Sequence, residues 1–358
     1  MLRAEAQDPV RVAVIGYGLA GRVMHAPLVA ATPGMTLASV VTGDPGRQAQ
    51  ATKENPGTRI LPRVELLWEL ATEHDLVVVA TSNRSHVPLG LAALEAGLPV
   101  VIDKPMAASA ADGRRLMTAA EERSLLLTVF QNRRWDGDFL TVRRLVSDGT
   151  LGSIIRFESR FERWRPEVQE GRWRERGARE EAGGLLFDLG SHLIDQAVSL
   201  FGFPERVYAE VDRRRPGARV DDDVFVALTH EGGIRSHLWM TFLAASPGPR
   251  IRVLGARGTY EKYGLDGQED DLKAGMRPED PEWGREPEDR WGRFTSGEEV
   301  RPIETEPGAW PQFYVQVGQA LRSGGPPPVP AAEAVAVLEI IEAALESAEL
   351  GAVVAPGR

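Results

Sequence analysis

The sequence predicts an α/β protein with two unlike halves: a doubly wound parallel sheet at the N-terminus and then an α+β domain with a large, mostly antiparallel open sheet. Three observations indicate this. The 358 residues exceed the usual size of one hydrophobic core. Strand and helix signals alternate up to Phe130, as in βαβ units. Beyond about residue 205, short strand signals follow one another with glycine-rich turns between them. We expect domains at residues 1–130 and 131–358.

Composition and charge are those of an ordinary globular protein, with 42% hydrophobic and 26% charged residues. A formal net charge of -10 argues against a nucleic-acid partner, which needs a positive surface. The absence of cysteine excludes disulfides, thiolate metal sites and a cysteine nucleophile, and it fits a reducing cytoplasm. The N-terminus has no apolar signal region, and no apolar run is long enough to span a bilayer. We therefore expect a cytoplasmic protein with no membrane partner.

The elements of the first domain follow from apolar runs between turn signals. The predicted strands are Val10–Ile15, Leu37–Val41, Thr58–Leu61, Leu76–Ala80, Pro99–Ile102 and Leu125–Phe130. The predicted helices between them include Val64–Glu73, Pro88–Glu95 and Ala108–Arg123. Six strands with helical crossovers make a parallel sheet with helices on both faces. Ligands of such sheets bind at the carboxyl ends of the strands, so the loops at those ends are the informative ones.

The first strand leads directly into a G-x-G-x-x-G loop, which consists of Gly16, Tyr17, Gly18, Leu19, Ala20 and Gly21. The first glycine permits a tight turn, the second lets a pyrophosphate approach the backbone, and the third lets the next helix pack closely on the strand. N–H groups at the start of that helix would hold the phosphates. In this context the loop predicts a dinucleotide-binding Rossmann fold. Pro27 falls where the helix should continue, so we expect a kink or an early end there.

The residues after the second predicted strand bear on the choice of cofactor. NAD enzymes of this fold commonly place an acidic residue there, on the ribose 2′-hydroxyl. Here Val41 is followed by Thr42 and Gly43. Thr42 can donate a hydrogen bond to a 2′-phosphate, and Arg47 is near enough in sequence to reach the same pocket. Asp44 would favour NAD instead if its carboxylate turned towards the ribose. The sequence favours NADP over NAD.

The stretch 183–195, GGLLFDLGSHLID, is the strongest candidate for the chemistry. Its apolar residues recur at helical spacing, and Asp188 and His192 stand four apart on one face. A carboxylate can fix the tautomer of an imidazole, so the pair suits proton transfer to or from a substrate hydroxyl. The alternative for such a pair is a surface ion pair. With Asp195 the two residues also supply ligand types for a metal, but we expect none.

Three motifs together make the chain recognisable. They are Thr81-Ser82-Asn83-Arg84-Ser85-His86, Asp103-Lys104-Pro105, and the run GLLFDLGSH from Gly184 to His192. In this order, and across nearly the whole chain, the sequence resembles the Gfo/Idh/MocA family of dinucleotide-dependent sugar and inositol dehydrogenases. The stretches GYGLAGRVMHAPL, NRRWD and GTYEKYGLD look closest to the branch that contains NADP-dependent scyllo-inositol dehydrogenases.

The resemblance implies an enzyme that transfers a hydride between a nicotinamide and a secondary hydroxyl or ketone of an inositol or sugar. In the family pattern His192 is the general base and acid, Asp188 orients it and contacts substrate, and Lys104 polarises the reacting oxygen. The pattern needs no metal, and it implies a cis bond between Lys104 and Pro105. Thr81, Asn83 and His86 would belong to the cofactor loop, with His86 capping that loop or packing under the cofactor rather than reacting.

The second domain offers weaker signals. Its predicted strands are Ser153–Trp164, Arg206–Asp212, Val224–His230, Arg235–Phe242, Ile251–Leu254 and Thr259–Tyr263, and its predicted helices are Asp138–Ser147, Gln312–Leu321 and Ala332–Glu349. Residues 265–305 show no period and are predicted as a long loop. Asn132 and Arg133 could hold substrate or the nicotinamide carboxamide, or they could join Arg134 in an ion-pair cluster. Trp164 and Trp173 could wall a polyol ring, although packing is commoner for tryptophan.

Two questions stay open at this point. A catalytically silent regulator that senses NAD(P) on the same fold is the alternative to an enzyme, and hydride exchange between two sugars on a retained cofactor is a third possibility. Lys104, Asp188 and His192 together favour the enzyme. The alternating patterns in Val224–His230 and Arg235–Phe242 predict an apolar sheet face that water should not see. We therefore expect a homodimer or homotetramer formed through the second sheet.

Overall fold

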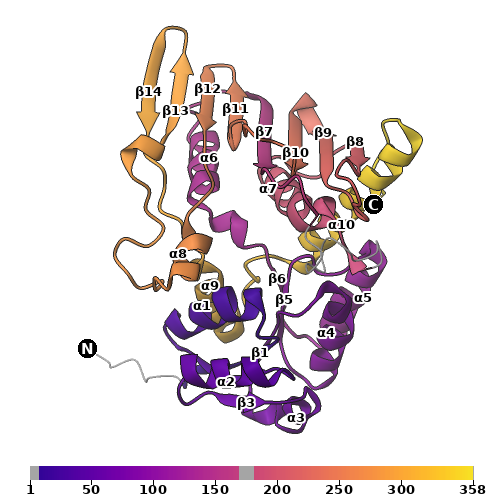
Figure 1. The fold of residues 1–358 in the computed structure, drawn as a ribbon, viewed down its shortest axis with the longest axis vertical. Coiled ribbons are helices and arrows are strands. Elements are labelled where there is room, and N and C mark those ends of the chain that lie inside the picture. Colours follow the sequence, from indigo (N-terminus) through magenta and orange to yellow (C-terminus); the bar gives the residue numbers. More distant parts are fainter. Residues whose placement is uncertain (1–7, 169–180, 358) are drawn as a thin grey trace.

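The computed structural model describes residues 8–168 and 181–357, and it contains two sheets with helices packed on them (Figure 1). The N-terminal sheet has the strand order β3-β2-β1-β4-β5-β6 with parallel neighbours throughout. This is the predicted doubly wound sheet, in the order typical of dinucleotide-binding proteins. Its strands are β1 (Val10–Ile15), β2 (Met35–Val41), β3 (Arg59–Leu61), β4 (Leu76–Val79), β5 (Val100–Asp103) and β6 (Leu127–Phe130).

The helices of this sheet differ from prediction at two places. They are α1 (Ala26–Ala31), α2 (Pro45–Glu54), α3 (Glu65–Glu69), α4 (His86–Glu95) and α5 (Ala110–Glu122). The helix predicted over Val64–Glu73 is interrupted at Leu70, after which a short 3₁₀ turn begins. The helix after the glycine loop does not end at Pro27. A wider π-helical turn over Ala20–His25 precedes it, so the proline, which has no N–H, falls in the first turn of α1.

The second sheet has eight strands in the order β14-β13-β12-β11-β7-β10-β9-β8, and only the β7–β10 pair is parallel. This confirms a large, mostly antiparallel open sheet. Its strands are β7 (Ile154–Glu162), β8 (Arg206–Asp212), β9 (Asp223–Thr229), β10 (Arg235–Thr241), β11 (Ile251–Gly255), β12 (Gly258–Lys262), β13 (Gly292–Ser296) and β14 (Glu299–Ile303). On β9 and β10 buried residues alternate with half-buried ones, and the buried side packs against α7 (Ser191–Phe201).

The prediction of an aperiodic loop over residues 265–305 is wrong. This segment contains α8 (Gln268–Ala274) and the hairpin β13–β14, which extends the second sheet at one edge (Figure 1, orange). The hairpin has little hydrophobic signature because β14 is exposed at every position but Ile303 and contains Pro302. Edge strands of this kind carry charge and proline rather than an apolar face, so periodicity does not reveal them.

The C-terminal helices connect the two sheets. The helix α10 (Ala331–Leu350) packs against α5 of the first sheet and against β8 and α7 of the second, while α9 (Pro311–Ser323) packs against α1. The Thr128 hydroxyl on β6 donates to the Val329 carbonyl at 2.8 Å, which fastens the approach to α10. These contacts hold the carboxyl ends of β5 and β6 beside the helix that carries His192. Within the described ranges, no helix is both long and apolar enough to cross a membrane.

Candidate active site

A cavity of about 970 Å³ opens at the carboxyl ends of β1, β4 and β5. This is the edge of a doubly wound sheet at which ligands bind. The first domain contributes to its walls Gly16, Gly18, Leu19, Ala20, Arg47, Thr81, Ser82 and Asp103, and the opposite side contributes Arg133, Arg163, Arg165, Asp188, Arg215, Asp221, Asp266, Glu269 and Lys273. The structure therefore brings the glycine loop, Thr81 and Asp188 to one cavity.

The glycine loop has the geometry that a dinucleotide requires. Gly16 has a φ of +98°, and a Cβ there would lie 2.5 Å from the Ala80 carbonyl oxygen. A Cβ on Gly21 would lie 1.9 Å from the Gly16 oxygen, so the helix after the loop can pack this closely only without a side chain. A Cβ on Gly18 would meet only the Arg47 guanidinium, at 3.8 Å. The backbone at Gly18 is thus open towards the cavity, which fits a pyrophosphate.

At the end of β2, the side chains of Asp44 and Arg47 lie differently. The Asp44 carboxylate caps α2 by accepting the Arg47 backbone N–H at 2.8 Å. The Arg47 guanidinium lies beside Gly18 and lines the cavity. Thr42 is buried; its backbone N–H donates to Leu61 O at 3.0 Å and its carbonyl accepts the Gln48 amide at 2.8 Å. The Arg47 guanidinium therefore faces the glycine loop, while the Asp44 carboxylate faces the N-terminus of α2.

The loops after β4 and β5 are joined through His86. Its Nδ1 lies 2.8 Å from Pro105 O and its Nε2 lies 3.3 Å from Thr81 O. Burial lowers the pKa of His86. The peptide bond between Lys104 and Pro105 is cis, as the resemblance implies. Asn83 donates to Ala182 O at 3.1 Å and so ties the β4 loop to the segment before the helix of His192.

Lys104, Asp188 and His192 lie together but in two pairs. The Lys104 Nζ is 3.0 Å from Asp188 Oδ1, and the His192 Nδ1 is 3.2 Å from Gln131 Oε1. Both members of the second pair are almost fully buried. Residues 186–190 form a π-helical turn before α7, in which i,i+4 side chains are spaced differently from those of a regular α-helix. The Asp188 carboxylate is thus paired with Lys104, and the Gln131 amide contacts the His192 imidazole.

The N-terminus of this helix is capped by Asp221, which no motif in the sequence marks. Its Oδ2 accepts the Leu186 N–H at 2.7 Å, and its backbone carbonyl accepts the Leu185 N–H at 3.1 Å. Gly184 has a φ of +93°, and a Cβ there would lie 1.9 Å from Asp221 Oδ1. The carboxylate therefore occupies the space that the glycine leaves. Burial raises the pKa of Asp221 to about 6.

This pKa predicts how stability depends on pH. The ordinary pKa of an Asp is 3.8, so a folded-state pKa of about 6 means that folding favours the protonated carboxyl. The contribution is fully present below pH 3.8 and is lost as the pH rises through 6. The free energy of unfolding of the wild type should therefore fall between pH 4 and pH 7 as Asp221 ionises. In Asp221→Asn, which keeps an acceptor for the Leu186 N–H, we expect this fall to be smaller by roughly 2 kcal/mol.

Urea unfolding at the two pH values measures this difference. Asp75→Asn is the comparison variant, because hydrogen bonding to Arg11 lowers the pKa of Asp75. An Asp with a lowered pKa stabilises the fold above its ordinary pKa of 3.8 and loses that contribution only below it, so this variant should leave the difference between pH 4 and pH 7 nearly unchanged. Equal pH dependence in wild type and Asp221→Asn would show that Asp221 does not titrate in this range.

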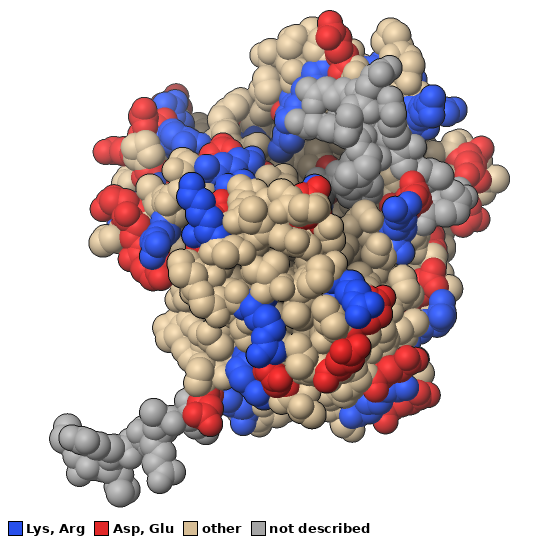
Figure 2. All heavy atoms as spheres, turned by 60° about the horizontal axis from the view of Figure 1, so that its bottom comes forward, with Lys and Arg blue, Asp and Glu red and all other residues tan. Residues whose placement is uncertain are grey.

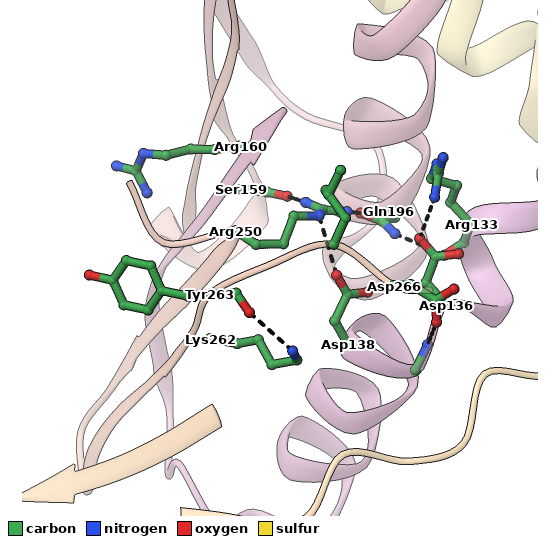
Figure 3. Close-up of polar contacts among 12 residues, drawn as sticks. Arg133, Asp136, Asp138, Ser159, Arg160, Gln196, Arg250, Lys262, Tyr263 and Asp266 are labelled. Carbon is green, nitrogen blue, oxygen red and sulfur yellow. Dashed lines mark hydrogen bonds and ion pairs between the residues drawn. The ribbon is translucent and has the colours of Figure 1, made fainter. Parts of the chain in front are cut away.

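The arginines after β6 form ion pairs, which is one of the two interpretations that the sequence allows. Arg133 contacts Asp136 at 3.1 Å (Figure 3). It also contacts Glu269 at 2.9 Å and lines the cavity. Arg134 forms a bidentate pair with Asp195 at 2.6 and 2.7 Å. Asn132 is buried beside them. Because Asp195 is engaged by Arg134, it is not placed as a metal ligand, and none of the described residues form a His/Asp/Glu group that could hold a metal ion.

A buried polar network behind the cavity fixes α7 to this segment (Figure 3). The Gln196 amide donates to Arg133 O at 2.8 Å and accepts from Arg250 at 3.3 Å. Arg250 also donates to Ser159 on β7 at 2.5 Å and lies 3.2 Å from Asp138. These bonds link α7, the sheet and the residues that follow β6. They make the wall behind His192 rigid, because each group is buried and would lose its partner on moving.

Trp164 is 57% exposed and is absent from the cavity lining, and its backbone pairs with Leu243. Trp173 lies outside the described residues. The walls come instead from residues that sequence reasoning missed, including Asp266 and Glu269 at and near α8. The only feature of the sequence that pointed to Asp266 and Glu269 was the unusual length of the segment predicted as a loop, because long loops in compact domains are commonly functional.

Both basic and acidic residues line the cavity. On the face seen in Figure 2, basic and acidic side chains are interspersed around a largely uncharged centre. A glycine loop of this geometry, open to a cavity that also holds a carboxylate paired with a lysine, defines a dinucleotide-dependent oxidoreductase.

Comparison with known proteins agrees with this class. The model of an oxidoreductase family's NAD-binding Rossmann fold matches residues 10–131, and the model of the same family's C-terminal α/β domain matches residues 143–355. The chain belongs to the Gfo/Idh/MocA family, and it is an NAD(P)-dependent oxidoreductase.

Relatives extend over the full chain. The uncharacterized oxidoreductase YdgJ of Escherichia coli is 41% identical over 96% of this chain and 97% of its own length. The scyllo-inositol 2-dehydrogenase (NADP(+)) IolW of Bacillus subtilis is 36% identical over 96% of this chain and 94% of its own length. Among solved structures, the oxidoreductase YvaA of Bacillus subtilis superposes with a TM-score of 0.92 at 36% identity, covering 99% of both chains.

Proposed function

We propose that this enzyme interconverts a secondary hydroxyl and a ketone on an inositol or a sugar, with NADP as the preferred cofactor. The observation that carries the proposal is the Lys104–Asp188 pair, at 3.0 Å, in contact with the cavity onto which the glycine loop opens. Named relatives support the substrate class. IolW is a scyllo-inositol 2-dehydrogenase, and the D-glucoside 3-dehydrogenase of Escherichia coli is 30% identical over 57% of this chain.

The roles of the side chains follow from their positions. The nicotinamide, when bound, accepts or supplies the hydride. Lys104 directly follows β5 and is paired with Asp188, which lines the cavity, and we assign its ammonium group to stabilise the negative charge that develops on the reacting oxygen. Asp188 holds that ammonium group in place, and His192 accepts the hydroxyl proton during oxidation and returns it during reduction. Gln131 and His192 are almost fully buried, which limits the access of water to the proton transfer.

A panel of inositols, aldoses and glycosides, each with NADP and with NAD, tests the proposal through the absorbance of the reduced cofactor. We expect turnover on at least one polyol or sugar and none on simple aliphatic alcohols. A protein that binds the cofactor and turns over no member of the panel would instead act as an NAD(P)-sensing regulator.

The choice of NADP rests on the turn after β2. Arg47 faces the glycine loop, whereas Asp44, which would repel a 2′-phosphate, is held as the cap of α2. We expect Arg47→Ala to raise the apparent KM for NADP by about 10-fold or more and to change that for NAD little, since one charged hydrogen bond contributes about 1.5–3 kcal/mol. Steady-state kinetics with both cofactors measure this.

The control is Arg59→Ala, because Arg59 on β3 is paired with Glu73 and does not line the cavity. It should leave both KM values unchanged. A wild-type kcat/KM that is higher with NAD would reverse the assignment and make Asp44 the selecting group.

We also propose that two copies of the chain associate through the outer face of the second sheet. The half-buried side of β9 and β10 carries Phe225, His237 and Trp239, with ring centroids 5.2–5.9 Å apart. The guanidinium of Arg160 lies 3.9 Å above the Trp239 ring. An aromatic cluster of this kind on an open face fits a second apolar surface. We expect a dimer or tetramer by light scattering at micromolar concentration, and a shift towards monomer in Trp239→Glu. A monomeric wild-type protein would contradict this.

A further inference from the structure

We propose that Gln131 is the positioning residue of His192: its amide oxygen holds the imidazole in the Nδ1–H tautomer and so puts the ring's basic lone pair on Nε2. This inference rests on the proposed function, in which His192 transfers the substrate proton. It adds a residue that no sequence motif marked.

The contact between Gln131 and His192 is buried on both sides. Gln131, the residue after β6, is 2% exposed, and His192 on α7 is 4% exposed. The Gln131 Oε1 lies 3.2 Å from Nδ1, and the Gln131 backbone N–H donates to Val129 O at 2.8 Å. On another side, the ring of Phe161 lies edge-on to His192 with centroids 6.4 Å apart. The amide and the imidazole are therefore shielded from bulk water.

The chemistry of the amide oxygen decides the tautomer. A carbonyl oxygen accepts and cannot donate, so a neutral imidazole can bond to it only by carrying its hydrogen on Nδ1. The other nitrogen then holds the lone pair that takes a proton. A neutral amide stabilises the imidazolium less than a carboxylate would, so the ring can return the proton when the enzyme runs in the other direction.

The segment that contains Gln131 is anchored independently of this bond. One turn further along α7, Asp195 pairs with Arg134 at 2.6 Å, and Gln196 donates to Arg133 O at 2.8 Å. The residues after β6 are therefore held on α7 even when the Gln131 side chain is changed. A substitution at Gln131 removes the hydrogen bond to His192 and leaves the backbone in place.

The first test reads the tautomer directly and needs no substrate. The chain has six histidines, so ¹⁵N-histidine-labelled protein gives a resolvable set of ring-nitrogen signals, and His192→Gln identifies the signal of His192. We expect the Nδ1–H tautomer in the wild type and a shift towards Nε2–H in Gln131→Met, which matches glutamine in length but has no amide. Gln196→Met is the matched control, since it removes a buried amide from α7 that contacts Arg133 and Arg250. It should leave the His192 tautomer unchanged.

The second test uses turnover on the substrate that the panel identifies. We expect Gln131→Met to lower kcat by roughly 10–10³-fold with little change in cofactor KM, because a base in the wrong tautomer fails in the chemical step. In Gln131→Glu the hydrogen bond is restored by a carboxylate, which favours the charged ring. The acid limb of its kcat/KM profile should therefore move to higher pH by about one unit.

The outcomes separate the two proposals. An Nε2–H tautomer in the wild type, or a tautomer that Gln131→Met does not change, overturns the role of Gln131 whatever the activity. A pH profile that is the same in wild type, Gln131→Glu and Gln131→Met does so as well. If no polyol or sugar is turned over, the proposed function fails, and the tautomer measurement alone decides the positioning role.

Discussion

Lys104→Ala and His192→Ala should each lower turnover by about 10²–10⁴-fold while the affinity for the cofactor changes little. Lys104 is the cation that contacts the reacting oxygen in the proposed mechanism, and His192 is the proton acceptor. Neither is part of the glycine loop or of the turn that carries Arg47, so the binding of the dinucleotide should survive both changes. Steady-state kinetics give the turnover, and titration of cofactor fluorescence gives the affinity.

Asp188→Asn separates the two pairs of the site. The Asn side chain still accepts a hydrogen bond from Lys104 but no longer neutralises it, so this variant should lose less turnover than Lys104→Ala. Lys53→Ala is the control for charge, because Lys53 is exposed on α2 away from the cavity. Near-wild-type turnover in Lys104→Ala or His192→Ala would remove that residue from the mechanism.

The parts of the fold that local patterns determine were predictable from the sequence. The strand β1 is an apolar run because both faces of a parallel sheet are covered. The glycines from Gly16 to Gly21 follow it because a side chain at these positions would clash or would block the approach of a dinucleotide. The alternation on β9 and β10 similarly predicted a sheet with one packed face. In these cases one element contains the whole signal.

The partners within the site depend on contacts between distant segments and could not be read in the same way. Gln131 and His192 are 61 residues apart, and Asp221 and Leu186 are 35 apart. Nothing in the sequence around Gln131 or Asp221 announces the contact. The π-helical turn over residues 186–190 has no simple signature either, yet it changes which side chains of the GLLFDLGSH motif face one another. Tertiary packing, rather than any local motif, determines these contacts.

Gly184 offers the sharpest test of how the helix of His192 is positioned. We expect Gly184→Ala to lower the unfolding free energy by about 3 kcal/mol or more, since a left-handed φ strains any side chain and the new Cβ would displace the capping carboxylate. Gly57→Ala is the matched control: Gly57 has a φ of +90°, close to the +93° of Gly184, but a Cβ there would meet nothing within 4 Å. It should cost only the backbone strain, about 1 kcal/mol.

A double-mutant cycle with Asp221→Ala isolates the contact. That substitution alone should destabilise the protein by about 1 kcal/mol through loss of the cap. In its background, however, the carboxylate that the Gly184 Cβ would meet at 1.9 Å is gone. Gly184→Ala should then cost close to what Gly57→Ala costs, which gives a coupling of roughly 2 kcal/mol. Urea unfolding of the four proteins measures the cycle. Simple additivity would show that the carboxylate of Asp221 does not require glycine at position 184.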